Sequence, residues 1–137
     1  MIALTWEQRL ADGTTRQAPN SVGYIIYTDT IYTDTGHMCY VGMNPNRPEW
    51  ASRTPTETEA FSAITGLGAY CGTVEVHADE RFVLHRVEIE RSPNNVGMVR
   101  KRWFTFHGPN RVSLRVDEPE LIPPIVESVL TWERVSK

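Results

Sequence analysis

The chain has 137 residues, of which 40% are hydrophobic and 23% charged, and its net charge is −3 at pH 7. This size and composition are ordinary for one globular domain, which we expect to span residues 1–137. The acidic balance argues against nucleic acid as a partner, because nucleic-acid binders usually present a basic face. No stretch is long and apolar enough to span a membrane, and no export signal is visible. We therefore expect a soluble, cytoplasmic protein with no nucleic-acid and no membrane partner.

Alternating apolar and polar residues predict strands along most of the chain, separated by clusters of Gly, Pro and Asn. The first three strands are expected at residues 3–10, 22–28 and 37–43. Residues 54–64 then combine a Thr cap, early Pro and Glu, and apolar residues at 60, 61 and 64. This pattern favours a short helix near residues 55–65 over an irregular connection, and such a helix could lie over one mouth of a barrel.

Five more strands are expected after this helix, at residues 68–77, 81–90, 98–106, 112–116 and 128–135. The total is eight, and eight antiparallel strands close into a small barrel. The fold class that we expect is therefore all-β, a closed or nearly closed eight-stranded antiparallel β-barrel with one short helix.

The tetrapeptide Tyr-Thr-Asp-Thr occurs at residues 27–30 and again at residues 32–35. The copy is too short to be a repeat of the solenoid kind. We interpret it as a local duplication that lengthens a hairpin loop or adds a bulge.

The two cysteines, Cys39 and Cys71, are not part of a CxxC motif. Two such cysteines in a cytosolic protein are most often free, buried thiols, and that is our expectation. A disulfide between them is the alternative.

His85 is the most informative polar residue. It shares its strand face with Val83, Val87 and Ile89, whereas Glu90 belongs to the opposite face. If the apolar face is the barrel interior, burial lowers the pKa of the imidazole and keeps the ring neutral. Two interpretations stay open, a ligand-binding or catalytic histidine and a core histidine that is tied to a tyrosine or to a backbone carbonyl.

The strand at residues 98–106 raises the same question for Arg102. Its side with Phe104 is the better candidate for the interior, and Arg100 shares that side. A buried guanidinium requires an anion or a full set of acceptors. Arg102 would therefore hold a ligand carboxylate or enolate, or else it pairs with Glu75, with Glu88 or with a backbone carbonyl.

Among the tyrosines on predicted strands, the alternation of apolar and polar residues places Tyr24 and Tyr70 best for pointing into the barrel.

Consecutive antiparallel strands bring residues of the same face side by side. Counting across the loop near residues 92–96 places His85 roughly opposite Arg102. We therefore expect both side chains to face one internal cavity, and we expect the pKa of His85 to lie below its ordinary value.

Several segments together resemble the lipocalin-like domain family, which belongs to the calycins. They are Gly23–Tyr27 with Gly36–Met38, Ala69–Val76, Val83–Val87 with Ser92–Gly97, Arg102–Phe104, and the closing segment Leu130–Val135. The resemblance implies an eight-stranded barrel with a central cavity, and it places His85 and Arg102 at the family's recurrent His and Arg positions. Because calycins often pack an arginine of the last strand across an N-terminal tryptophan, it also implies a contact between Trp6 and Arg134.

The leading functional hypothesis is the binding of a small, largely apolar molecule with a polar or anionic group inside the barrel. The expected ligand-binding residues are Tyr24, Tyr70, Val83, His85, Val87, Arg102 and Phe104. We expect no cofactor and no metal, and the partner would be a small hydrophobic or amphipathic molecule. The sequence leaves a homodimer open.

Two other functions compete with this hypothesis. The first is a cofactor-independent enzyme such as an isomerase, cyclase or lyase, because the resemblance extends to calycin-like enzymes of secondary metabolism. There His85 would be the general acid or base, and Arg102 would stabilise negative charge. The second is an interaction module whose interior is simply packed.

Overall fold

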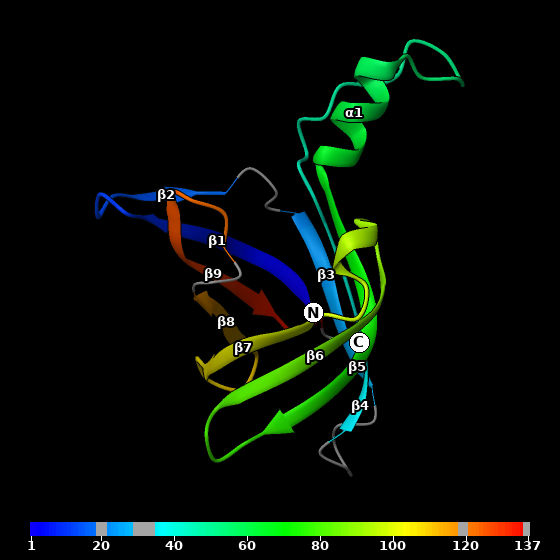
Figure 1. The fold of residues 1–137 in the computed structure, drawn as a ribbon. Helices are drawn as coiled ribbons and strands as arrows, with labels where there is room; N and C mark the ends of the chain where they lie inside the picture. Colours follow the sequence, from blue (N-terminus) through cyan, green and yellow to red (C-terminus); the bar gives the residue numbers. More distant parts are fainter. Residues whose placement is uncertain (19–21, 29–34, 118–120, 136–137) are drawn as a thin grey trace.

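The computed structural model describes residues 1–18, 22–28, 35–117 and 121–135. Within these ranges the chain forms one antiparallel sheet (Figure 1). Its strands are β1 (Ile2–Leu10), β2 (Thr15–Gln17), β3 (Val22–Thr28), β4 (Thr35–Met43), β5 (Leu67–His77), β6 (Phe82–Glu90), β7 (Val99–Phe106), β8 (Arg111–Asp117) and β9 (Ile125–Glu133). A helix α1 (Glu57–Thr65) precedes β5, and a 3-10 turn η1 (Pro93–Asn95) precedes β7.

The sheet closes because β1 pairs with both β3 and β9. The eight long strands therefore form a closed antiparallel barrel, which confirms the predicted fold class. The short strand β2 adds to β1 beyond this ring and was not anticipated. Its three residues are too few for an alternating pattern to be recognised in the sequence.

The register of β1 and β9 places Trp6 opposite Leu130. The indole N–H of Trp6 donates to Ser128 Oγ at 2.6 Å. Arg134 follows the end of β9, is exposed, and lies four residues beyond Leu130, the register partner of Trp6. Because side chains on paired strands meet only their register partners and diagonal neighbours, the expected contact between Trp6 and Arg134 is wrong.

A β-bulge changes the direction of two side chains at the end of β6. The pairing of β5 with β6 slips between Cys71 and Gly72, which leaves Glu88 as an extra residue on β6. Beyond the bulge the alternation is reversed, so Ile89 is 69% exposed and the side chain of Glu90 is only 5% exposed. The sequence pattern had assigned Ile89 to the interior and Glu90 to the surface, which is wrong because an uninterrupted period was assumed.

Gly72 allows this close approach of β5 and β6. A Cβ atom at this position would lie 1.9 Å from the carbonyl oxygen of Arg86. Since that oxygen belongs to the backbone, it cannot turn aside as a side chain would. The bulge therefore depends on a residue without a side chain at position 72.

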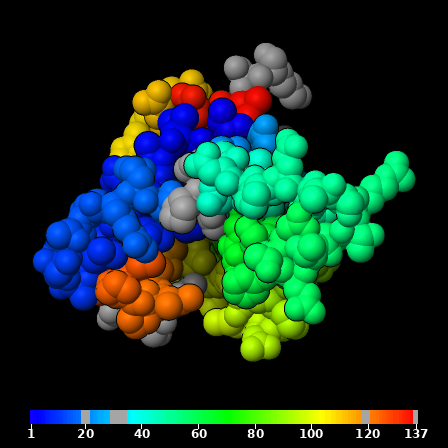
Figure 2. Space-filling model, turned by 90° about the horizontal axis from the view of Figure 1, so that it is seen from above, coloured from blue at the N-terminus to red at the C-terminus, as the bar shows by residue number. Residues whose placement is uncertain are grey.

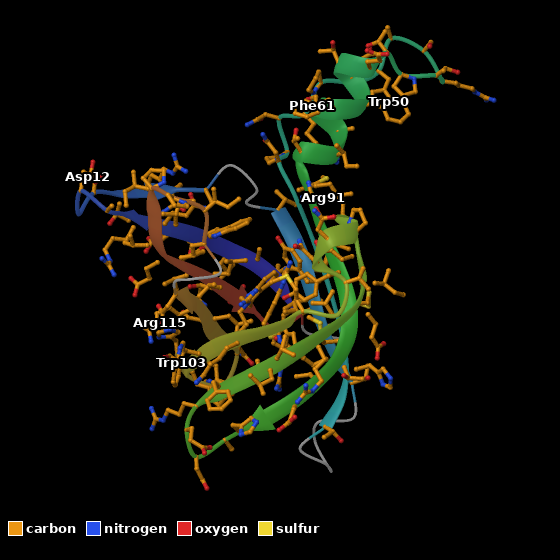
Figure 3. All side chains as sticks on the ribbon, viewed as in Figure 1. Asp12, Trp50, Phe61, Arg91, Trp103 and Arg115 are labelled. Atoms are coloured by element: carbon orange, nitrogen blue, oxygen red, sulfur yellow. A yellow bond between two sulfur atoms is a disulfide. The ribbon has the colours of Figure 1, made fainter. Side chains whose placement is uncertain are left out.

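The predicted helix is confirmed as α1, which begins after the N-cap Thr56. Thr56 Oγ accepts a hydrogen bond from the backbone N–H of Glu59, and the Glu59 carboxylate accepts one from the N–H of Thr56. None of the helical residues is buried. Figure 1 shows α1 beyond the end of β5, and Figure 3 shows Phe61 and Trp50 on this projecting arm. The helix therefore stands clear of the barrel and does not lie over its mouth.

Cys39 and Cys71 lie directly opposite each other on β4 and β5 and form a disulfide, with their Cα atoms 4.1 Å apart. Their neighbours Met38 and Tyr70 point into the barrel, so both cysteines belong to the outer face. The expectation of two free, buried thiols is wrong, because it took no account of the register that joins the two strands.

The connection between β3 and β4 contains most of the duplicated Tyr-Thr-Asp-Thr sequence, and residues 29–34 lie outside the described residues.

Among the described helices, none has the length and apolar character that crossing a membrane would require.

Reduction of the Cys39–Cys71 disulfide should lower the free energy of unfolding. The two cysteines are 32 residues apart, and the unfolded chain gains entropy worth about 3–4 kcal/mol when a loop of that length is opened. Urea unfolding with and without a reductant measures the difference. A Cys39→Ser/Cys71→Ser double variant should match the reduced protein and should not respond to the reductant. A wild-type protein that is equally stable in both conditions would contradict the cross-link.

Candidate functional site

A pocket of about 380 Å³ lies inside the barrel, at the end that carries α1, η1 and the connection from β8 to β9. Figure 2 looks down on this end, where the orange atoms of the β8–β9 connection and the green atoms of the α1–β5 segment border a hollow. Aromatic, aliphatic and basic side chains line the pocket. The lining includes Trp6, Tyr40, Tyr70, Arg100, Arg102, Leu114, Leu130 and Trp132.

One wall of the pocket is aromatic. The rings of Tyr40 and Tyr70, on the paired strands β4 and β5, are 5.4 Å apart between centroids. Trp132 of β9 meets Tyr40 edge to face at 6.0 Å, and Trp6 of β1 also lines the pocket. Rings at these separations and angles have the offset or edge-on geometry that aromatic pairs prefer. This wall offers flat apolar surfaces against which a ligand can lie.

The basic part of the lining comes from β7, where Arg100 and Arg102 share the inward face because they are two residues apart. Arg100 Nη2 lies 3.1 Å from the Glu90 carboxylate, and its guanidinium lies over the ring of Tyr70 at 4.6 Å. The ion pair exists because the bulge in β6 turns Glu90 inward. Arg100 is thus held between a carboxylate and an aromatic face.

Arg102 is itself buried, and its Nη1 donates to the backbone carbonyl of Lys101 at 2.7 Å. Of the partners considered for Arg102, the structure shows a backbone carbonyl. Glu75 pairs instead with Arg86 on the outer face, at 3.2 Å.

His85 lies beneath the pocket and is fully buried, with an exposed fraction of 0%. Its Nε2 is 2.9 Å from the hydroxyl of Tyr27, and its Nδ1 is 2.9 Å from the hydroxyl of Tyr70. Burial first, and then the charges of Arg102 and Arg100, lower the pKa of His85 to about 3. The direction of the predicted pKa shift is confirmed. The ring is neutral at physiological pH, and it is tied to tyrosines as the core interpretation expected.

The hydrogen count limits the direction of these two bonds. A neutral imidazole has one donor and one acceptor, so one tyrosine donates to the ring and the other accepts from it. Burial holds the pKa of Tyr27 well above its ordinary value, so its hydroxyl keeps its hydrogen. Which of the two tyrosines donates depends on the tautomer of His85.

The predicted site residues separate into two groups. Tyr70 and Arg102 line the pocket, whereas His85, Val83 and Val87 are buried beside it and are not part of its lining. The register pairs His85 with Arg100 and places Arg102 opposite Val83, two residues away from the expected partner. His85 therefore senses both charges without facing the pocket, and the expectation that it faces the same cavity as Arg102 is wrong.

Two other predicted residues lie away from the pocket. Tyr24 is 57% exposed on the outer face, so its predicted inward direction is wrong. The inward residues of β3 are Ile25 and Tyr27, and Tyr27 is the tyrosine that reaches His85. Phe104 packs against the core and lines a separate hollow near the β7–β8 turn, with Trp103 and Arg115, which Figure 3 labels.

The sequence interpretation also missed lining residues, and three of them are aromatic: Trp6, Tyr40 and Trp132. Tyr40 lies two residues after the buried Met38 and so shares its strand face, a pattern that would have assigned Tyr40 to the interior.

No group of three His, Cys, Asp or Glu side chains with metal-binding geometry occurs within the described part of the chain.

A family model described as a lipocalin-like domain matches residues 5–135. The chain belongs to this family. No curated protein and no solved structure is similar enough to be matched to it. Membership in the lipocalin-like family agrees with the closed barrel and its interior pocket, and it does not identify a ligand.

The low pKa of His85 should make this lipocalin-like barrel less stable in mild acid. The unfolded chain takes up a proton near pH 6.5, whereas the folded protein excludes it down to about pH 3. The contribution is therefore complete above pH 6.5 and is lost as the pH falls, by up to about 1.4 kcal/mol per pH unit. Urea unfolding at about pH 7, 6 and 5 measures the slope.

The His85→Gln variant should lose this part of the slope, and His37→Gln, on the exposed face of β4, should retain it. An equal slope in the wild type and in His85→Gln would contradict the assignment. If the variant does not fold, an NMR titration of the His85 ring in the wild type tests the assignment. A ring that titrates near pH 6.5 is incompatible with a buried imidazole bonded to Tyr27 and Tyr70.

Proposed function

We propose that the pocket binds a small, largely apolar molecule that carries one anionic group. The observation that supports this most is the presence of two guanidinium groups, Arg100 and Arg102, in a wall that is otherwise aromatic and aliphatic. Ligand pockets typically combine apolar walls with a few polar groups that fix orientation. A guanidinium matches the geometry of a carboxylate or an enolate, and the bond is strengthened where water is excluded.

The two arginines have different roles in this proposal. Arg100 is engaged by Glu90 and lies over Tyr70, so it keeps its position with or without a ligand. Arg102 lines the same pocket and is buried. Because Glu90 already offsets the charge of Arg100, we take Arg102 as the main contact of the anionic group, with Arg100 adding to the positive potential.

The geometry favours binding over catalysis by His85. The imidazole does not line the pocket, and both of its nitrogens are bonded to tyrosine hydroxyls. Its pKa of about 3 makes it a weak base at neutral pH. An interaction module with a fully packed interior is likewise a poorer explanation of a pocket of about 380 Å³. The cytoplasmic location and a place in secondary metabolism stay predictions.

Two fluorescent probes with the same apolar skeleton test the role of Arg102. The anionic probe is 1-anilinonaphthalene-8-sulfonate, and the neutral probe is N-phenyl-1-naphthylamine, which lacks the sulfonate. Arg102→Met should weaken binding of the anionic probe about tenfold or more, because a hydrogen bond between charged groups contributes roughly 1.5–3 kcal/mol. The affinity of the neutral probe should change by about twofold or less.

Lys101→Met is the matched control, because Lys101 precedes Arg102 on β7 and lies over the outer rings of Phe82 and Trp103. It should leave the affinity for both probes unchanged. Circular dichroism should show that both variants fold, and Arg102→Gln replaces Arg102→Met if the latter does not. Equal losses for both probes in the Arg102 variant, or the same loss in Lys101→Met, would refute anion recognition by Arg102.

A further inference from the structure

The two tryptophans that line the pocket differ in how their indole N–H groups are used. The N–H of Trp6 donates to Ser128 Oγ at 2.6 Å. Trp132 is only 1% exposed, and among the described residues its indole nitrogen has no acceptor. A buried donor without a partner costs free energy, and such groups in native proteins usually have a specific explanation.

The protein around Trp132 supplies little that could accept this hydrogen. Its partners across the barrel strands are Ala3 on β1 and Val112 on β8, both with apolar side chains. Tyr40 approaches with its ring at 6.0 Å between centroids, in an edge-to-face arrangement. Trp132 lines two hollows, a small one shared with Ala3 and Gly42 that has no room for a water molecule, and the pocket itself. An acceptor for the indole N–H is therefore best supplied by what the pocket binds.

We propose that the ligand of this pocket is a flat aromatic carbonyl acid, whose neutral carbonyl oxygen accepts the indole N–H of Trp132. The inference rests on the proposed function, because it assumes that the acidic group of the same molecule lies at Arg102. The aromatic wall of Trp6, Tyr40, Tyr70 and Trp132 supports a flat ring system rather than a flexible aliphatic chain. A second anionic group at Trp132 is disfavoured, because a buried charge requires more than one neutral donor.

The expected consequence is selectivity for the carbonyl group. A site that is built to hydrogen-bond a polar group rejects an analogue that lacks it, because the protein donor is then left buried and unpaired. Fluorenone carboxylate and fluorene carboxylate make this comparison cleanly. They share the ring skeleton and the carboxylate, and they differ only in a carbonyl or a methylene at the bridge.

The wild-type protein should bind fluorenone carboxylate about tenfold more tightly than fluorene carboxylate, tested as the 2- and the 4-carboxylate. Trp132→Phe keeps an aromatic ring and removes the N–H, so it should reduce this preference to about twofold or less. Trp6→Phe is the matched control and should retain the preference, because the Trp6 N–H is already bound to Ser128. Isothermal titration calorimetry measures all three proteins.

The indole resonances provide a second readout in the intact protein. The Trp132 Nε1–H signal, assigned by its absence from Trp132→Phe, should move downfield with fluorenone carboxylate and not with fluorene carboxylate. If Trp132→Phe does not fold, selective labelling of the wild type gives the same readout, and an unmoved signal overturns the inference.

The outcomes separate the two proposals. Equal affinity for both acids, with binding that still depends on Arg102, overturns the carbonyl contact and leaves anion binding in place. Failure of both acids to bind, or binding that is indifferent to Arg102→Met, overturns the proposed function and this inference together. A carbonyl preference that survives in Trp132→Phe assigns the contact to another residue and also overturns it.

Discussion

The antiparallel register of the barrel decides which side chains can meet in its interior. Closure between β1 and β9 leaves no free edge in the ring of long strands, so every second residue must point inward. The slip between β5 and β6 then changes this alternation at one place and turns Glu90 into the barrel. Because Glu90 is inside, Arg100 has a counter-ion and is held over Tyr70. The ion pair that holds Arg100 depends on this single extra residue.

Below the pocket, an imidazole is buried near the two cations Arg100 and Arg102. His85 stays neutral, and its two nitrogens are satisfied by Tyr27 and Tyr70. Tyr70 makes three contacts at the same time: its hydroxyl is bonded to His85, its ring lines the pocket, and the same ring lies under the guanidinium of Arg100. A ligand anion at Arg102 would offset part of the charge that lowers the pKa of His85. If an anion binds at Arg102 as proposed, the pKa of His85 should therefore rise.

Much of the barrel could be predicted from local patterns, because alternation in long strands reports directly on burial. The strand that contains Val83, His85 and Val87 shows this, since its apolar face is continuous and the histidine shares it. The pattern failed on β3, where Ile25 and Ile26 are both apolar, so that the phase is ambiguous and Tyr24 was chosen in place of Tyr27. Both isoleucines fit a strand, and only the pairing with β4 decides between them.

Other features depend on long-range register, which no local pattern contains. Cys39 and Cys71 become partners only when β4 and β5 pair across the intervening helix. The exchange of Ile89 and Glu90 follows from a bulge, and a glycine at position 72 permits a bulge without requiring one. The open donor of Trp132 is a property of its surroundings, since Trp6 has the same side chain and a bonded N–H.

The most direct test of the account is a crystal structure of the complex with 1-anilinonaphthalene-8-sulfonate. The barrel offers this probe two apolar places, the interior pocket and an exposed row on the outer face that includes Ile26 and Ile89. We expect the rings of the probe against the aromatic wall of the pocket, with the sulfonate within hydrogen-bonding distance of Arg102. A probe bound on the outer face over Ile26 and Ile89, with the pocket unoccupied, would contradict the account.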